Sequence, residues 1–262
     1  MRAALVLIVA TLCAAAEPPG RAALRAFQQW KQRPANAVLE WDESLSRYRA
    51  SLRAAGLSER AAERTMRLIA AYDEADLYNR VYTGAPSFNT QPNRFLVEAA
   101  AAIPAAGSAL DAGMGQGRNA LFLASKGWKV TGFDVAEAGL RAASARAAAL
   151  GLAVETVHAS DEEFDFGRSK WDLIAIIHAM EKRTVHRVRR ALKPGGYVIV
   201  EAALIEPGGY PHGYVKDELR EVFRGYHILR YEETQAPHDF GDDLTKPEPL
   251  VRLLARKPTA PR

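Results

Sequence analysis

Apolar and polar residues follow two different patterns along this chain. From residue 22 to 82, apolar residues recur at helical spacing, as at Leu45, Tyr48 and Leu52, in a background rich in Ala, Arg and Glu. Gly56 is expected to end one helix, and Ser58 is suited to cap the next. The pattern predicts a helical extension, then a turn-rich segment over 83–93 and a further helix over 94–102.

Beyond residue 107, short β-rich runs alternate with helical stretches. The predicted strands are 108–112, 129–133, 153–158, 171–177 and 197–201, and the predicted helices between them are 118–126, 136–150 and 184–192. Such alternation is typical of βαβ units and a parallel sheet. Residues 193–196, Lys-Pro-Gly-Gly, predict a sharp turn into the fifth strand.

The end of the chain breaks this alternation. A helix over 215–223 is expected to precede two strands, 226–232 and 250–256, with no helix between them. Two such strands favour a hairpin. The predicted fold is therefore α/β: a mostly parallel sheet of seven strands with a C-terminal antiparallel hairpin, preceded by a helical extension.

The first sixteen residues have a character of their own. Met1-Arg2, an apolar run over 3–12 and three alanines at 14–16 are typical of a secretory signal peptide, and the run is too short for a membrane span. A buried or amphipathic first helix, or a misplaced start codon, would give the same pattern. We predict a signal peptide over 1–16, a helical extension over 17–85 and an α/β domain over 86–262. The protein is expected to be exported, periplasmic or secreted, if the signal is used, and cytoplasmic otherwise.

Composition excludes several classes of function. The 35 basic and 31 acidic residues are interspersed, and no basic run is interleaved with aromatic residues, so we expect no nucleic-acid partner. Cys13, the only cysteine, would leave with the signal, and no His-x-x-x-His spacing occurs. We therefore expect no metal site and no thiol nucleophile.

The first predicted strand runs directly into a glycine loop. Asp111 is followed by Gly113, Gly115 and Gly117, and such a loop lets backbone turn tightly and approach a ligand. In an open α/β sheet this loop lies at the edge where ligands bind. A carboxylate at position 111 would repel a pyrophosphate and attract the amino group of a methionine moiety, so the loop favours a cationic nucleoside over a dinucleotide.

From here to about residue 257 the chain resembles the class I S-adenosylmethionine-dependent methyltransferases. Asp111 and the three glycines match the family's first motif, and Asp134, which ends the second strand, matches the acid that accepts both ribose hydroxyls. Asp161, after the third strand, matches the acid that usually accepts from the adenine amino group. The resemblance implies a Rossmann-like fold with S-adenosylmethionine as the cofactor.

Three further segments extend the resemblance. Residues 171–174 are similar to the family's fourth strand and 192–196 to its turn before the fifth. Residues 117–131 are similar to the small-molecule branch that includes the tellurite-resistance and thiopurine methyltransferases. This implies methyl transfer to a small-molecule acceptor by direct displacement, without specifying the acceptor.

The resemblance also indicates where acceptor-binding residues are expected. Family members place them after the fourth strand, here His178 and Glu181, and in the N-terminal segment, here Tyr82, Asn89 and Arg94. His178 could act as a general base near neutral pH, although a histidine in such a position is also commonly a packed residue.

Other interpretations stay open at this point. Asp134 could cap the following helix, and Asp161 could belong to a solvated acidic cluster. An NAD(P)-dependent oxidoreductase would also use a glycine loop and an acid after the second strand, although Asp111 and the closing hairpin disfavour it. A non-catalytic binding protein with this fold is the remaining alternative.

Overall fold

The computed structural model describes residues 17–84, 88–180, 182–208, 212–237, 239 and 245–259. Within these residues, seven strands form one sheet in the order β3-β2-β1-β4-β5-β7-β6. The strands are β1 (Ser108–Ala112), β2 (Lys129–Asp134), β3 (Val154–His158), β4 (Trp171–Ile177), β5 (Leu192–Ala203), β6 (His227–Pro237) and β7 (Pro247–Arg256). The first five are parallel, and β7 is antiparallel to both β5 and β6. The predicted α/β sheet and its C-terminal hairpin are confirmed.

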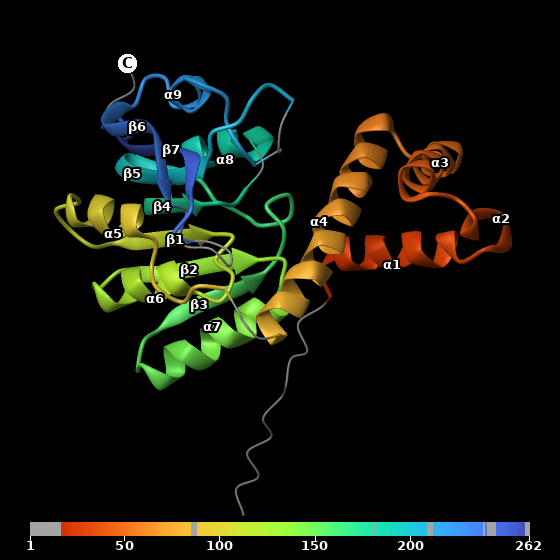
Figure 1. Ribbon diagram of the computed structural model, residues 1–262, viewed down its shortest axis with the longest axis horizontal. Helices are drawn as coiled ribbons and strands as arrows, with labels where there is room; N and C mark the ends of the chain where they lie inside the picture. Colours follow the sequence, from red (N-terminus) through yellow and green to blue (C-terminus); the bar gives the residue numbers. More distant parts are fainter. Residues whose placement is uncertain are drawn as a thin grey trace, which may run out of the picture.

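Helices cover both faces of this sheet (Figure 1). They are α5 (Arg94–Ala101), α6 (Arg118–Ser125), α7 (Glu137–Ala149), α8 (Val185–Ala191), which follows a 3-10 turn over Lys182–Thr184, and α9 (Glu218–Val222). Burial on both faces explains why β4 reads as an almost continuous apolar run. Leu173 and Ala175 pack in a core with α5, α6 and α7, whereas Ile174 and Ile176 pack in a core with α8 and α9.

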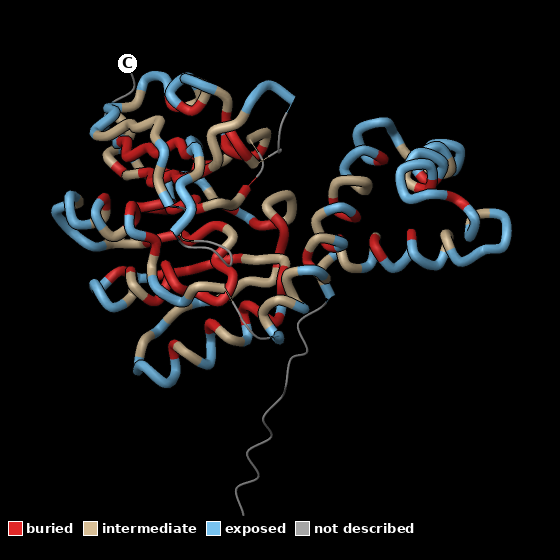
Figure 2. Tube along the Cα trace, in the orientation of Figure 1, coloured by how far each residue is buried: buried red, intermediate tan, exposed pale blue. Residues whose placement is uncertain are grey.

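The N-terminal extension is helical, as predicted, and most of it projects from the sheet (Figure 1). It consists of α1 (Pro19–Lys31), α2 (Pro34–Ala37), α3 (Trp41–Ala54) and α4 (Glu59–Thr83). Ser58 caps α4 by accepting from the Ala61 N–H, as its position in the sequence indicates. Figure 2 shows that buried residues concentrate in the sheet, while the projecting helices are largely exposed outside a small core around Phe27 and Tyr72.

Two local predictions differ from the structure in their bounds. Residues 193–196 lie within β5, which already starts at Leu192, where it pairs with Trp171. The chain kinks there, with Gly195 at a φ of 80°, and pairing with β4 continues at Tyr197. The helix expected over 215–223 is restricted to α9. Tyr214 forms a β-bridge with Leu204, and Asp217 has a positive φ of 61°, so helical backbone cannot begin earlier.

The predicted signal peptide lies outside the described residues. None of the helices that the structure describes combines the length and the apolar character needed to cross a membrane.

Candidate active site

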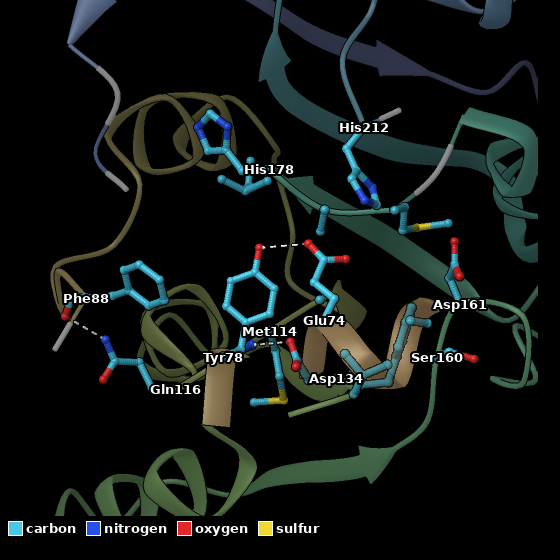
Figure 3. A pocket seen from close by; sticks show the side chains of 18 of the residues that line it. Glu74, Tyr78, Phe88, Met114, Gln116, Asp134, Ser160, Asp161, His178 and His212 are labelled. Carbon is cyan, nitrogen blue, oxygen red and sulfur yellow. Dashed lines mark hydrogen bonds between the residues drawn. The ribbon is translucent and has the colours of Figure 1, made fainter. Parts of the chain in front are cut away.

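A cavity of about 260 Å³ lies at the carboxyl ends of the parallel strands, beneath α4 (Figure 3). The order of the sheet reverses between β1 and β4, and ligands of open α/β sheets bind in the crevice at this point. The cavity is lined by α4, by residues 88–89 and by the segments that follow β1, β2, β3, β4 and β5.

The glycine loop between β1 and α6 forms one wall of the cavity. Gly113, Gly115 and Gly117 have φ values of 68°, 51° and 79°, in the left-handed region that favours glycine. A Cβ on Gly113 would overlap the side chain of Ala179 after β4, and one on Gly115 would overlap the hydroxyl of Tyr82 in α4. Gly113 and Gly115 line the cavity, whereas Gly117 is the N-cap of α6 and packs against α7.

Asp134 holds the glycine loop and also faces the cavity. Its Oδ2 accepts from the N–H of Gly115 at 2.8 Å, and its Oδ1 accepts from the N–H of Ala136 at 2.7 Å. Burial raises the pKa of Asp134 above its usual value, while these two hydrogen bonds oppose the rise. The N-cap of α7 is Ala136, so Asp134 is not the helix cap. Each carboxylate oxygen can accept a second hydrogen bond, which suits a vicinal diol.

Asp161 lines the cavity on the side of β3, where its Oδ2 accepts from the hydroxyl of Thr184 at 2.6 Å. Of the acidic residues that follow it, Asp165 is exposed, whereas Glu162 and Glu163 have partners in the helical extension. Glu162 pairs with Arg67 of α4, and Glu163 accepts from the N–H of Gly20 and the hydroxyl of Tyr72. The two glutamates therefore attach the helical extension to the loop that carries Asp161.

Asp111 lies behind the glycine loop. Its side chain is only 1% exposed, and it is not among the described residues that line the cavity. Burial raises the pKa of Asp111 to about 7, although the nearby Arg118 opposes the rise. The raised pKa favours the neutral carboxyl group, which would repel a pyrophosphate less strongly than a carboxylate does. Its Oδ2 has no hydrogen-bond partner among the described residues.

Of the predicted acceptor-binding residues, Tyr82 and Asn89 line the cavity. Tyr82 lies on the glycine loop, and Asn89 donates to the carbonyl of Asp239 at 3.2 Å. Arg94 is exposed at the start of α5, where it pairs with Glu98, and is not among the described lining residues. Glu181 lies outside the described residues.

His178 follows β4 with a φ of 52°, a strained value for a residue with a Cβ. It lines the cavity, but Figure 3 shows its ring turned away from Glu74 and Tyr78. Its Nε2 is 3.1 Å from the Oε1 of Glu201, a carboxylate that is 1% exposed. Burial alone would raise the pKa of Glu201, but His178 and Arg252 lower it below its usual value. The orientation of His178 favours a positioning role over that of a general base.

The described residues also bring together His178, Glu201 and Asp239, whose ligand atoms lie within 4.8 Å of one another. A metal ion fits poorly between them. The Nδ2 of Asn93 donates to Glu201 at 2.6 Å and to Asp239 at 2.9 Å, and its Oδ1 accepts from the N–H of Leu96, which fixes the orientation of the amide. A donor thus occupies the place between the carboxylates.

Sequence reasoning missed two carboxylates, Glu74 and Glu201. Glu201 had a signal, because a charged residue at the end of the apolar run 197–200 needs buried partners. Glu74 lies four residues before Tyr78, which in turn lies four residues before Tyr82, so the three share one face of α4 and all line the cavity.

Comparisons with known proteins bear on the family and the fold. Residues 109–196 match a family model described as a methyltransferase domain, and the resemblance to the class I S-adenosylmethionine-dependent methyltransferases is confirmed. The chain is also similar to hemagglutinin 1 of Eikenella corrodens, with 28% identity over 163 residues, covering 57% of this chain and 54% of that protein. The chain thus spans about half the length of this curated relative.

Solved structures share the fold at low identity. The N-methyltransferase NodS from Bradyrhizobium japonicum, in complex with S-adenosyl-L-homocysteine, has a TM-score of 0.56 and 16% identity, covering 72% of this chain and 98% of that one. The [4+2]-cyclase SpnF has a TM-score of 0.58 and 18% identity, covering 72% and 97%. Because these two proteins catalyse different reactions, the fold alone does not determine the chemistry.

Proposed function

We propose that this chain is an enzyme that transfers a methyl group from S-adenosylmethionine to a small-molecule acceptor. The observation that carries the proposal is the arrangement of Gly115, Asp134 and Asp161 along one cavity, at or just after the carboxyl ends of β1, β2 and β3. The methyltransferase-domain match over 109–196 supports it.

The residues present fit this cofactor. The glycine loop, which lines the cavity at Gly113 and Gly115, would hold the methionine moiety, and Asp134 would accept from the two ribose hydroxyls. Between Asp134 and Asp161 the lining is apolar, with Phe133 among its residues, which suits an adenine ring whose amino group would donate to Asp161. When bound, the cofactor supplies an electrophilic methyl group on a sulfonium.

The protein's own contribution is then mainly positional. Displacement at a methyl carbon needs the nucleophile in line with the leaving group, and holding reactants in such a geometry supplies about 7–11 kcal/mol in favourable cases. Tyr82 and Tyr78 of α4, together with Phe88, form one side of the cavity.

Titration calorimetry with S-adenosyl-L-homocysteine and with NAD(H) tests the proposal. We expect binding of the first and none of the second. Tight NAD(H) binding without S-adenosyl-L-homocysteine binding would establish the oxidoreductase instead. As a matched pair, Asp161→Ala should weaken S-adenosyl-L-homocysteine binding about tenfold, whereas Asp165→Ala, an exposed aspartate nearby, should leave it unchanged.

A protein that binds the cofactor but catalyses no methyl transfer is the remaining alternative. An assay with a panel of acceptors distinguishes the two, because only a methyltransferase would form S-adenosyl-L-homocysteine. We also propose that the protein is exported, and this proposal rests only on the signal peptide predicted over 1–16.

A further inference from the structure

The cavity extends beyond the part that the nucleoside would occupy. Once the loops after β1, β2 and β3 are assigned to the cofactor, the remaining wall comes from α4, residues 88–89 and the segments after β4 and β5. We call this wall the acceptor side. Its polar and aromatic side chains include Glu74, Tyr78, Tyr82, Phe88, His178 and His212.

Glu74 makes the acceptor side acidic. Its carboxylate points into the cavity and accepts from the hydroxyl of Tyr78 at 3.3 Å (Figure 3). Among the described lining residues there is no lysine, and the guanidinium of the one arginine, Arg118, is held at 2.8 Å by the carboxylate of Asp239. A carboxylate that points into the cavity attracts a cation and repels an anion. The acceptor side therefore favours a cation.

The ring of Tyr78, whose hydroxyl donates to Glu74, belongs to a cluster of three aromatic rings. The ring centroids of Tyr78 and Tyr82 are 6.4 Å apart, those of Tyr78 and Phe88 are 6.1 Å apart, and those of Tyr82 and Phe88 are 5.5 Å apart. Aromatic faces attract ammonium groups, and a carboxylate next to them adds a charge-assisted hydrogen bond. Rings and carboxylate together select a compact organic cation.

We propose that the methyl acceptor is a small amine, which binds as an ammonium ion against Glu74 and the rings of Tyr78, Tyr82 and Phe88. This inference rests on the proposed function. It disfavours the oxyanion acceptors to which the resemblance with tellurite-resistance methyltransferases would point.

The reaction requires a neutral nitrogen. The ammonium gives one proton to the imidazole of His212, which enters the cavity from the segment after β5 on the side of Glu74 (Figure 3). The nitrogen lone pair then forms the bond to the methyl carbon, and the electron pair of the broken carbon–sulfur bond stays on sulfur. The products are an N-methylammonium ion and S-adenosyl-L-homocysteine.

Matched acceptors test the inference on the full chain. Benzylamine, benzyl alcohol, benzyl mercaptan and benzoate share a ring and differ in charge and nucleophile, and putrescine adds an aliphatic amine. Each is titrated into protein saturated with S-adenosyl-L-homocysteine, and each is assayed for methyl transfer by mass spectrometry. We expect binding and methylation of at least one amine, and no binding of benzoate.

Variants locate the effect at Glu74. Glu74→Gln should weaken amine binding and raise its KM about 10- to 100-fold, with affinity for S-adenosyl-L-homocysteine changed less than twofold. Glu74→Asp, which keeps the charge, should restore part of the loss. Glu98→Gln, an exposed glutamate on α5, is the matched control and should change neither quantity. Circular dichroism melting of each variant checks that it is folded.

The outcomes separate the two proposals. Absence of S-adenosyl-L-homocysteine binding would overturn the proposed function itself. Binding of S-adenosyl-L-homocysteine with transfer only to the thiol, alcohol or carboxylate, or to no acceptor, would overturn the amine inference and leave the cofactor assignment standing. A tenfold loss of S-adenosyl-L-homocysteine affinity in Glu74→Gln would also overturn it, because Glu74 would then belong to the cofactor site.

Discussion

Replacing Gly115 by alanine tests whether α4 rests on the glycine loop. Gly115 has a φ of 51°, and a Cβ there would overlap the hydroxyl oxygen of Tyr82 and stand 3.1 Å from the Cζ of the same ring. The ring of Tyr82 is itself packed against Tyr78 and Phe88, so it cannot move away freely. The methyl group must therefore displace either α4 or the loop.

The cost has two parts of different origin. Left-handed backbone costs a residue with a Cβ roughly 1–2 kcal/mol, and overpacking of a closely packed contact costs about 1–3 kcal/mol more. Gly115→Ala should lower the free energy of unfolding by the sum, about 2–5 kcal/mol. It should also weaken S-adenosyl-L-homocysteine binding, because the N–H of Gly115 orients Asp134.

The chain offers a control for each part. Gly127, in the turn before β2, has a φ of 86° and nothing within 4 Å of an added Cβ, so Gly127→Ala should show the backbone cost alone. Tyr82→Phe removes the overlapping oxygen. The double variant Gly115→Ala with Tyr82→Phe should recover about 1–3 kcal/mol relative to Gly115→Ala. Urea unfolding followed by circular dichroism measures all four variants.

The double-mutant cycle provides the refutation. If the effects of Gly115→Ala and Tyr82→Phe add within about 0.5 kcal/mol, the two residues do not touch, and α4 does not close the cavity as described. A Gly115→Ala variant no less stable than Gly127→Ala would lead to the same conclusion.

Four further predictions concern the cofactor site and the N-terminus. Asp134→Ala should weaken S-adenosyl-L-homocysteine binding by about 1.5–3 kcal/mol in calorimetry, and unchanged affinity would remove Asp134 from the site. Because the pKa of folded Asp111 is raised to about 7, the contribution of this group to stability is present at low pH and lost as pH rises through 7. Asp111→Asn should therefore gain stability over the wild type between pH 5 and 8 in urea unfolding. The same pH dependence of stability in both proteins would contradict this. Burial would raise the pKa of Glu163, but hydrogen bonds from Ser160, Gly20 and Tyr72 lower it, so the contribution of Glu163 to stability is present at neutral pH and lost under acid conditions. Glu163→Gln should lower the free energy of unfolding by about 1–3 kcal/mol at pH 7 and by much less at pH 3. An equal loss at both pH values would contradict these hydrogen bonds. For export, N-terminal sequencing of protein from an expressing cell should find Glu17 first, and an intact Met1 would exclude cleavage.

The sheet could be predicted because its signals are local. Strands 108–112 and 171–177 are apolar runs of strand length, and their bounds in the structure are the same. The turn expected over 193–196 lies within β5 for a tertiary reason. Pro194 and Gly195 are typical turn residues. Because Leu192 already pairs with Trp171, they become part of β5 and cause a register shift in its pairing with β4.

That Gly115, Asp134 and Asp161 line one cavity could also be predicted from the sequence. Asp134 ends a parallel strand, the other two follow one, and the carboxyl ends of such strands meet at one edge. The acceptor side was not accessible in this way. Glu74 is one of several acidic residues on α4, and only the packing of that helix onto the sheet determines which of them faces the cavity.

That packing makes the helical extension a wall of the site. The C-terminal part of α4 contacts the α/β domain at two places. Tyr82 covers the glycine loop, and the Oδ1 of Asn79 accepts from the N–H of Ala138 in the first turn of α7. Because α7 has no side-chain cap of its own, α4 supplies one of the hydrogen bonds that its first turn lacks. Glu162 and Glu163 fasten the other side of the extension to the loop of Asp161. A helix held at the loops after β1, β2 and β3 cannot shift without moving the residues that we propose hold the nucleoside. We therefore expect occupancy of that site to change the shape of the acceptor side through α4.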